Sequence, residues 1–185
     1  MKKINKILLI ENSDTNKSDI VACLPKPYTC EHKAIITEDV ILEAKKIAYN
    51  LCISDILDID TIAEGHSLES HEVFMSFERG IRRIAELRPH LDCSLVIVTK
   101  LPVDFFMQHI DNMKNDYALE TIFAKDCKNL YRKLSNSVTL PFGMVYGHEG
   151  VFIDIKPYFA NNVVDEEILN QWKDGFKKLL ARICK

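Results

Sequence analysis

Four short apolar runs, each followed by polar residues, constrain the fold of this chain more than any other feature of its sequence. The runs, with the residues that follow them, are Ile7–Ile10 before Glu11 and Asn12, Leu51–Ser54 before Asp55, Leu95–Val98 before Thr99 and Lys100, and Thr121–Ala124 before Lys125. Short continuous apolar runs are typical of buried strands in parallel sheets, and ligands bind beyond the carboxyl ends of such strands. The acids, hydroxyl and amine that follow the runs therefore indicate a site for a phosphoryl group and a cation.

Helical patterns separate these runs, so the sequence predicts a doubly wound α/β fold with a five-stranded parallel sheet and right-handed crossovers. Strands are predicted over Lys6–Ile10, Tyr28–Ile36, Leu51–Ser54, Leu95–Val98 and Thr121–Ala124. Helices are predicted over Thr15–Leu24, from a cap at Thr37 onward, and over Val73–Leu87, Val103–Asn115 and Cys127–Ser135. The polar second strand is expected at an edge of the sheet.

The pattern changes after residue 137. Met144–Tyr146 and Val151–Ile155, joined by a turn with Gly147 and Gly150, predict a β-hairpin. Asp165 then caps a helix whose apolar residues, from Ile168 to Ile183, are spaced by three and four. We therefore divide the chain into a main domain, 1–137, and a C-terminal extension, 138–185, whose helix packs either on the main domain or on a second copy in a homodimer.

Composition narrows the class of protein. The 185 residues are 47% apolar with a net charge of −3, which suits one sizeable core and gives no general attraction to nucleic acid or membranes. No apolar segment is long enough to cross a bilayer. The six cysteines form no C-x-x-C pair, and several lie in or beside apolar runs. We expect reduced thiols and a cytoplasmic protein.

Residues around the ends of the predicted strands resemble a known family, the receiver domain of two-component response regulators. Leu8–Asn12 is similar to the family's first strand with its acidic pair, and Cys52–Asp55 resembles the strand that carries the phosphoacceptor. Val96–Thr99 resembles the strand with the hydroxyl, and Phe123–Lys125 the strand with the lysine. The resemblance covers about 6–137 and implies the flavodoxin-like strand order 2-1-3-4-5.

The resemblance also implies a chemistry. Asp55 would accept a phosphoryl group from a histidine kinase or a small phosphodonor, and a downstream protein partner would read the result. Glu11, Asn12, Asp55 and the backbone carbonyl of Leu57 would hold Mg²⁺, which prefers oxygen ligands. Thr99 and Lys125 would contact the phosphoryl oxygens. Apart from gaining and losing its own phosphoryl group, the protein is not expected to be an enzyme.

Several positions depart from the family pattern. Asn12 stands where a second acid is usual, Lys100 where a small residue is usual, and Asp126 where a proline commonly follows the lysine. The segment between Asp55 and Thr99 is also longer than usual, with the excess in 58–70. These departures indicate an alternative: a pseudo-receiver that keeps the fold as a protein-interaction or dimerisation module without phosphotransfer.

Weaker patterns point to other chemistry. Asp58-Ile59-Asp60-Thr61 is similar to the D-x-D-x-T motif of haloacid dehalogenase-type phosphotransferases, but its threonine comes one residue early. A phosphohydrolase on a similar sheet is thus a third, less favoured reading. His66 and His71 are five residues apart, which does not place both squarely on one helix face for a metal.

Overall fold

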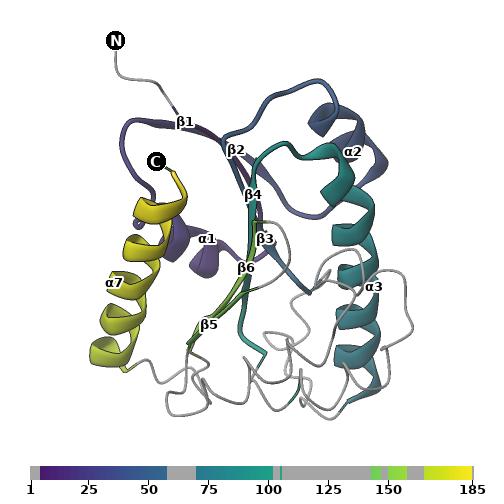
Figure 1. Cartoon of the computed structure of the whole chain (residues 1–185). Helices are drawn as coiled ribbons and strands as arrows, with labels where there is room; N and C mark the ends of the chain where they lie inside the picture. The colour runs from purple at the N-terminus through teal and green to yellow at the C-terminus, as the bar shows by residue number, and fades with distance from the viewer. Residues whose placement is uncertain are drawn as a thin grey trace.

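The computed structural model describes residues 5–57, 70–101, 105, 143–146, 150–157 and 165–184. Within them, one twisted sheet lies between helices on both faces (Figure 1). Its strands are β1 (Asn5–Ile10), β2 (Tyr28–Lys33), β3 (Leu51–Asp55), β4 (Ser94–Thr99), β5 (Gly143–Tyr146) and β6 (Val151–Ile155). The first four agree with the predicted strands, although β2 ends at Lys33 and not at Ile36.

The strand order is β2-β1-β3-β4-β6-β5. The first five of these strands are parallel neighbours, and β5 pairs antiparallel with β6 at the edge. The predicted α/β class with five parallel strands in flavodoxin-like order is confirmed. The predicted hairpin is confirmed as well, because its two strands are β5 and β6.

The identity of the fifth parallel strand differs from the prediction. The partner of β4 on the side away from β3 is β6, with Val96 opposite Phe152 and Thr99 opposite Ile155. The prediction that Thr121–Ala124 pairs with β4 is therefore wrong. That run, together with the predicted helices Val103–Asn115 and Cys127–Ser135, lies mostly or wholly outside the described residues. An apolar run alone did not distinguish the two candidate strands.

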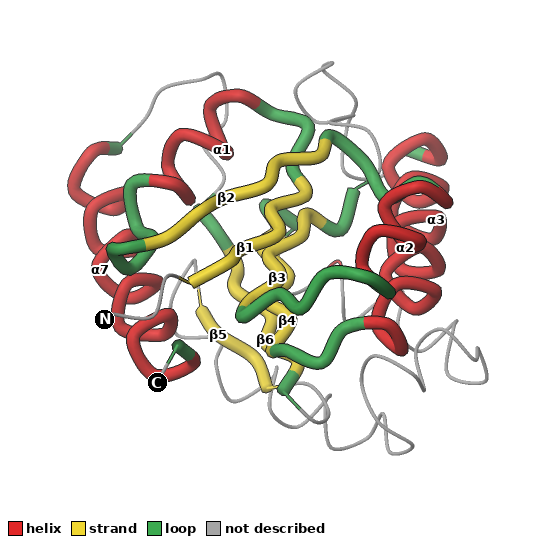
Figure 2. The backbone as a smooth tube through the Cα atoms, turned by 90° about the horizontal axis from the view of Figure 1, so that it is seen from above, coloured by secondary structure: helices red, strands yellow, loops and turns green. Residues whose placement is uncertain are grey.

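Over the described residues, four helices cover the sheet: α1 (Asp14–Val21), α2 (Glu38–Ala44), α3 (His71–Leu87) and α7 (Glu166–Ile183). A short 3₁₀ turn, η1 (Arg88–His90), follows α3. Side-chain oxygens of Ser13, Thr37, Ser70 and Asp165 accept hydrogen bonds from backbone N–H groups and so begin the helices. Figure 2 shows α1 and α7 on one face of the sheet and α2 and α3 on the other.

The helix α7 belongs to the same core as the first strands. Its Trp172 and Phe176 are buried, their rings stack with centroids 5.2 Å apart, and they share a cluster with Ile7 and Ile53. Residues of the predicted extension 138–185 thus complete the sheet through β6 and cover one of its faces through α7. Of the two predicted locations for this helix, the structure shows packing within the chain.

Truncation of Trp172 tests this packing. The indole is 1% exposed, so Trp172→Ala removes a large buried ring and should lower the free energy of unfolding by about 3–5 kcal/mol. Urea unfolding measures the effect, and Gln171→Ala, on the exposed side of the same helix, serves as the matched control. Equal stability of the Trp172 variant and the wild type would contradict a buried α7.

Candidate functional site

Four polar residues gather where adjacent parallel strands end. Ile10 is opposite Ser54, Asp55 is opposite Val98, and Thr99 is opposite Ile155. Glu11, Asp55, Thr99 and Lys156 therefore end β1, β3, β4 and β6 or follow them directly at one edge of the sheet. We refer to these four residues as the carboxyl-end cluster. Their arrangement is the one that parallel sheets commonly use to build ligand sites.

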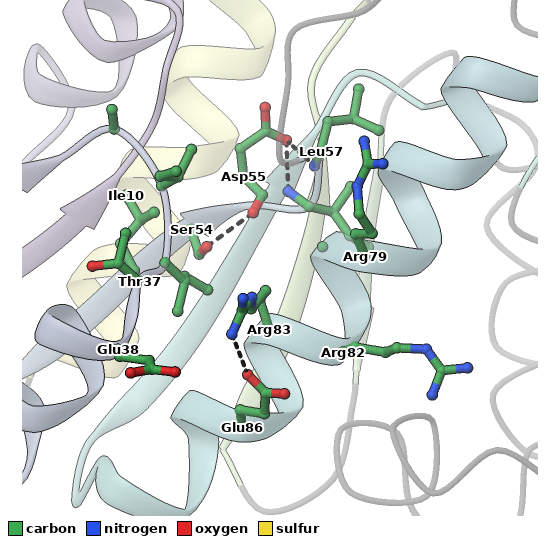
Figure 3. Close-up of a pocket in the computed structure, with 15 residues that line it drawn as sticks. Ile10, Thr37, Glu38, Ser54, Asp55, Leu57, Arg79, Arg82, Arg83 and Glu86 are labelled. Atoms are coloured by element: carbon green, nitrogen blue, oxygen red, sulfur yellow. Dashed lines mark hydrogen bonds and ion pairs between the residues drawn. The ribbon is translucent and has the colours of Figure 1, made fainter.

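Asp55 is the half-buried acid of this cluster. Its Oδ1 accepts hydrogen bonds from the backbone N–H groups of Ile56, at 2.6 Å, and Leu57, at 3.3 Å. Figure 3 shows the carboxylate standing at the end of its strand with these bonds drawn. The two amide donors fix the orientation of the side chain, as a positioned acceptor requires.

Glu11 and Asn12 occupy the turn between β1 and α1. Glu11 is buried, and its Oε1 accepts a hydrogen bond of 2.8 Å from the backbone N–H of Ser13, the cap of α1. Its backbone carbonyl oxygen lies 2.7 Å from Nε2 of His32 on β2. The acid is thus held by the start of the helix and by the neighbouring edge strand, and Asn12 beside it is half-buried.

Thr99 ends β4 as a buried hydroxyl. Its Oγ1 accepts a 3.1 Å hydrogen bond from the backbone N–H of Leu101. A hydroxyl also carries one proton to donate, so this side chain can contact a further acceptor. The backbone carbonyl of Thr99 accepts a 2.8 Å hydrogen bond from the backbone N–H of Lys156, and this bond joins the ends of β4 and β6.

The lysine of the cluster is Lys156, which the sequence prediction missed. The predicted residue, Lys125, lies outside the described residues, and the strand expected to present it does not pair with β4. The signal for Lys156 was present in the sequence: Val151–Ile155 is an apolar run followed by Lys156 and Pro157. That lysine–proline pair is the feature that Lys125, followed by Asp126, lacked. Because Val151–Ile155 was interpreted only as a strand of a hairpin, Lys156 was not predicted as a site residue.

Lys156 is held by the first helix. Its Nζ donates hydrogen bonds to Oδ1 of Asn16, at 2.8 Å, and to Oδ2 of Asp19, at 2.5 Å. Asp19 also pairs through Oδ1 with Nζ of Lys173 on α7, at 2.8 Å. The ammonium of Lys156 further lies 5.3 Å from the ring centre of Trp172. A chain of charged contacts therefore connects β6, α1 and α7.

Burial and pairing shift these ionisations in defined directions. Burial lowers the pKa of Lys156 despite its ion pair with Asp19, and the nearby charge of Lys100 contributes to the lowering. Burial acts to raise the pKa of Asp19, but hydrogen bonds and charges from Lys156 and Lys173 outweigh it, so this pKa lies below its ordinary value. Asp19 is thus held as a carboxylate between two lysines.

A second acid, Asp154, is buried beneath α7. It is 6% exposed, and its Oδ1 accepts a hydrogen bond of 2.5 Å from the indole N–H of Trp172. Burial raises the pKa of Asp154 to about 7, and the indole hydrogen bond only partly offsets this effect. This carboxyl therefore holds its proton in the folded protein at pH values where an exposed aspartate has lost it.

The stability of the protein should consequently depend on the ionisation of Asp154. Between pH 4 and pH 7 the folded state binds a proton that the unfolded state releases, because the pKa is raised from 3.8 to about 7. The contribution of this group to the free energy of unfolding therefore falls as pH rises through that window, by a few kcal/mol at about 1.4 kcal/mol per pKa unit. Urea unfolding at several pH values measures it.

Asp154→Asn is the informative comparison, because the amide does not ionise and still offers an oxygen to the indole of Trp172. Other groups contribute to both proteins, so their effects cancel in the difference between the two curves. We expect the variant to gain stability relative to the wild type between pH 5 and pH 8. Parallel curves for the two proteins would contradict a buried, raised Asp154.

The predicted Mg²⁺ ligands suit that ion in kind. Glu11 and Asp55 supply carboxylates, Asn12 an amide oxygen and Leu57 a backbone carbonyl, and Mg²⁺ prefers oxygen donors. Glu11 and Asp55 end or follow the adjacent strands β1 and β3, and the backbone of Leu57 contacts Asp55. Over the described ranges no three histidine, cysteine, aspartate or glutamate side chains group to hold a metal. The predicted set contains only two such side chains, so it relies on the amide and the carbonyl.

Comparisons with protein families, with curated proteins and with solved structures gave no match to this chain. In the part of the chain that the structure describes, no helix combines the length and the apolar character needed to cross a membrane.

Proposed function

We propose that this chain is a receiver-like signalling protein switched by phosphorylation of Asp55. The observation that carries the proposal is the strand register, which brings Glu11, Asp55, Thr99 and Lys156 to the carboxyl ends of four adjacent strands. Two acids, a hydroxyl and an amine at one edge match the chemistry of phosphoryl transfer to a carboxylate. The identification of the lysine as Lys156 makes this match better than the sequence suggested.

Each member of the cluster has a role in this proposal. An oxygen of Asp55 forms the new bond to phosphorus while the bond from phosphorus to the donor, a phosphohistidine or a small phosphodonor, breaks. Mg²⁺ held by Glu11, Asn12, Asp55 and the carbonyl of Leu57 would supply positive charge for the phosphoryl oxygens. Thr99 would donate its hydroxyl proton to one of those oxygens, and Lys156 would offer its ammonium to another.

The contacts of Lys156 suggest how the signal leaves the site. To reach a phosphoryl group at Asp55, the ammonium exchanges its bonds with Asn16 and Asp19 for bonds to phosphoryl oxygens. Charge-assisted hydrogen bonds are worth about 1.5–3 kcal/mol each, and a phosphoryl group carries more negative charge than the single carboxylate of Asp19, so the new contacts outweigh the old ones. Because Asp19 also binds Lys173, this exchange alters a contact between α1 and α7. A downstream protein partner would then read the surface formed by these two helices.

A second candidate function is a phosphorylation-independent pseudo-receiver. The specific observation in its favour is that the ammonium of Lys156 is bound to Asn16 and Asp19 on α1. Asn12 also replaces a carboxylate, which lowers the negative charge that attracts Mg²⁺. In this function the fold serves as a protein-interaction or dimerisation module, and Lys156 is a structural cation.

Binding of beryllofluoride, a phosphoryl mimic, separates the two functions. In the presence of Mg²⁺ we expect saturable binding by the wild type, measured by fluorescence of Trp172, and its loss in Asp55→Asn. Lys156→Met should weaken the binding at least about tenfold, since one charge-assisted bond of about 1.5 kcal/mol is removed. Lys125→Met is the matched control, and it should leave the affinity unchanged.

Two results would decide against the phosphorylation switch. Wild type and Asp55→Asn could respond alike, in which case the pseudo-receiver is the function that remains. Alternatively, Lys125→Met could weaken binding while Lys156→Met does not, which would contradict the assignment of the lysine. Circular dichroism of every variant shows whether a loss of binding reflects a loss of fold.

A further inference from the structure

A cavity opens between α2 and α3, beside the carboxyl ends of β1 and β3 (Figure 3). Its volume is about 730 Å³. Sites for small molecules commonly measure about 300–1,000 Å³, so the cavity has the size of a site for a compound of modest mass. Asp55 lies at its margin, but most of its lining comes from the segment 34–38 and from α3.

One side of the cavity is apolar. Its apolar lining residues are Ile10, Ala34, Ile35, Ile36, Ile56 and Leu57. Ile35 is 45% exposed, and only it and Leu42 are prominent exposed apolar side chains over the described ranges. An apolar lining of this kind favours a ligand with an apolar part.

A glycine of α3 also lines the cavity. Gly80 lies in the middle of the 17-residue helix α3 and lines the cavity. Glycine inside a helix is less favourable than alanine, because it loses more backbone freedom on folding. Without a side chain, this position adds only backbone to the lining of the cavity.

Arginines line the opposite side. Arg79, Arg82 and Arg83 lie within about one turn of α3 and all border the cavity. In Figure 3, Arg79 extends beside Leu57, Arg83 points toward Glu86, and Arg82 points away from the other lining residues. Helix α3 therefore provides two guanidinium groups, those of Arg79 and Arg83, that can contact a ligand in the cavity. Arg82 on the same helix allows a comparison with an arginine that points elsewhere.

The ion pairs of Arg82 and Arg83 are on the surface. Nη1 of Arg83 lies 2.9 Å from Oε2 of Glu86, and both side chains are about half exposed. Nη2 of Arg82 lies 2.9 Å from Oε1 of Glu78. Exposed pairs of this kind are weak, so a ligand anion can replace Glu86, whose carboxylate then turns into water.

We propose that this cavity binds a small organic monophosphate. The guanidinium groups of Arg83 and Arg79 would hold the phosphate, since their planar forks match phosphate oxygens. The apolar or aromatic remainder of the ligand would lie against Ile35 and Ile36. Three acids, Glu38, Asp55 and Glu86, also line the cavity, which favours a ligand with one phosphate over a polyanion. The proposal goes beyond phosphorylation of Asp55 and does not require it.

Isothermal titration calorimetry with phenyl phosphate, in buffer without Mg²⁺ or beryllofluoride, tests the proposal. We expect saturable binding to the full chain, and at least fivefold weaker binding for Arg79→Gln and for Arg83→Gln. Arg82→Gln is the matched control on the same helix and should stay within twofold of the wild type. Inorganic phosphate should bind at least tenfold more weakly than phenyl phosphate, because it lacks the apolar part.

Several outcomes would overturn the proposal. These are no saturable binding of phenyl phosphate by the wild type, unchanged binding by both Arg79→Gln and Arg83→Gln, or an equal loss in Arg82→Gln. Equal affinity for inorganic phosphate would overturn the role of the apolar side. The test uses neither Mg²⁺ nor a phosphoryl mimic, so its result is independent of whether Asp55 accepts a phosphoryl group.

Discussion

The parallel pairing of β6 with β4 is the interaction on which the rest of the structure depends. It begins with a hydrogen bond from the N–H of Leu95 to the carbonyl of Gly150 and ends with one from the N–H of Lys156 to the carbonyl of Thr99. This register brings Lys156 to the same edge as Asp55. It also places the residues after β6 where α7 can return along the face that already carries α1. Without this pairing, neither the carboxyl-end cluster nor the core that α7 shares with Ile7 and Ile53 would form.

The face beneath α7 combines an apolar core with buried charge. Trp172 connects the two: its ring stacks on Phe176, its N–H binds Asp154, and the ammonium of Lys156 lies over it. Removing charged groups from water is costly, and a buried ion pair contributes little net stability relative to apolar packing. The buried ion pair of Lys156 with Asp19 is therefore hard to explain by stability. In the proposed switch, the contact of Lys156 changes during function, which would account for it.

Elements that depend on residues near one another in the sequence could be predicted, whereas the pairing of β6 with β4 could not. Alternating apolar runs and helices predicted β1, β3, β4 and their order, and the spacing from Ile168 to Ile183 predicted α7. The location of Glu11, Asp55 and Thr99 at strand ends was predictable because each directly follows an apolar run in the sequence. The fifth strand was misassigned because Thr121–Ala124 is a short apolar run, whereas Asp154 interrupts Val151–Ile155, and propensity does not specify which one pairs with β4. The contact of Lys156 with Asp19 crosses 137 positions, so no local pattern indicated it.

The partner of β4 is the most direct test of this account. Cross-strand nuclear Overhauser effects between backbone amide and α protons report strand neighbours in an isotopically labelled protein that keeps its α protons. The account predicts such effects between Val96–Val98 and Phe152–Asp154, with the pattern of parallel strands. Effects between Val96–Val98 and Ile122–Ala124 instead would contradict it, because Lys156 would then no longer follow the strand beside β4.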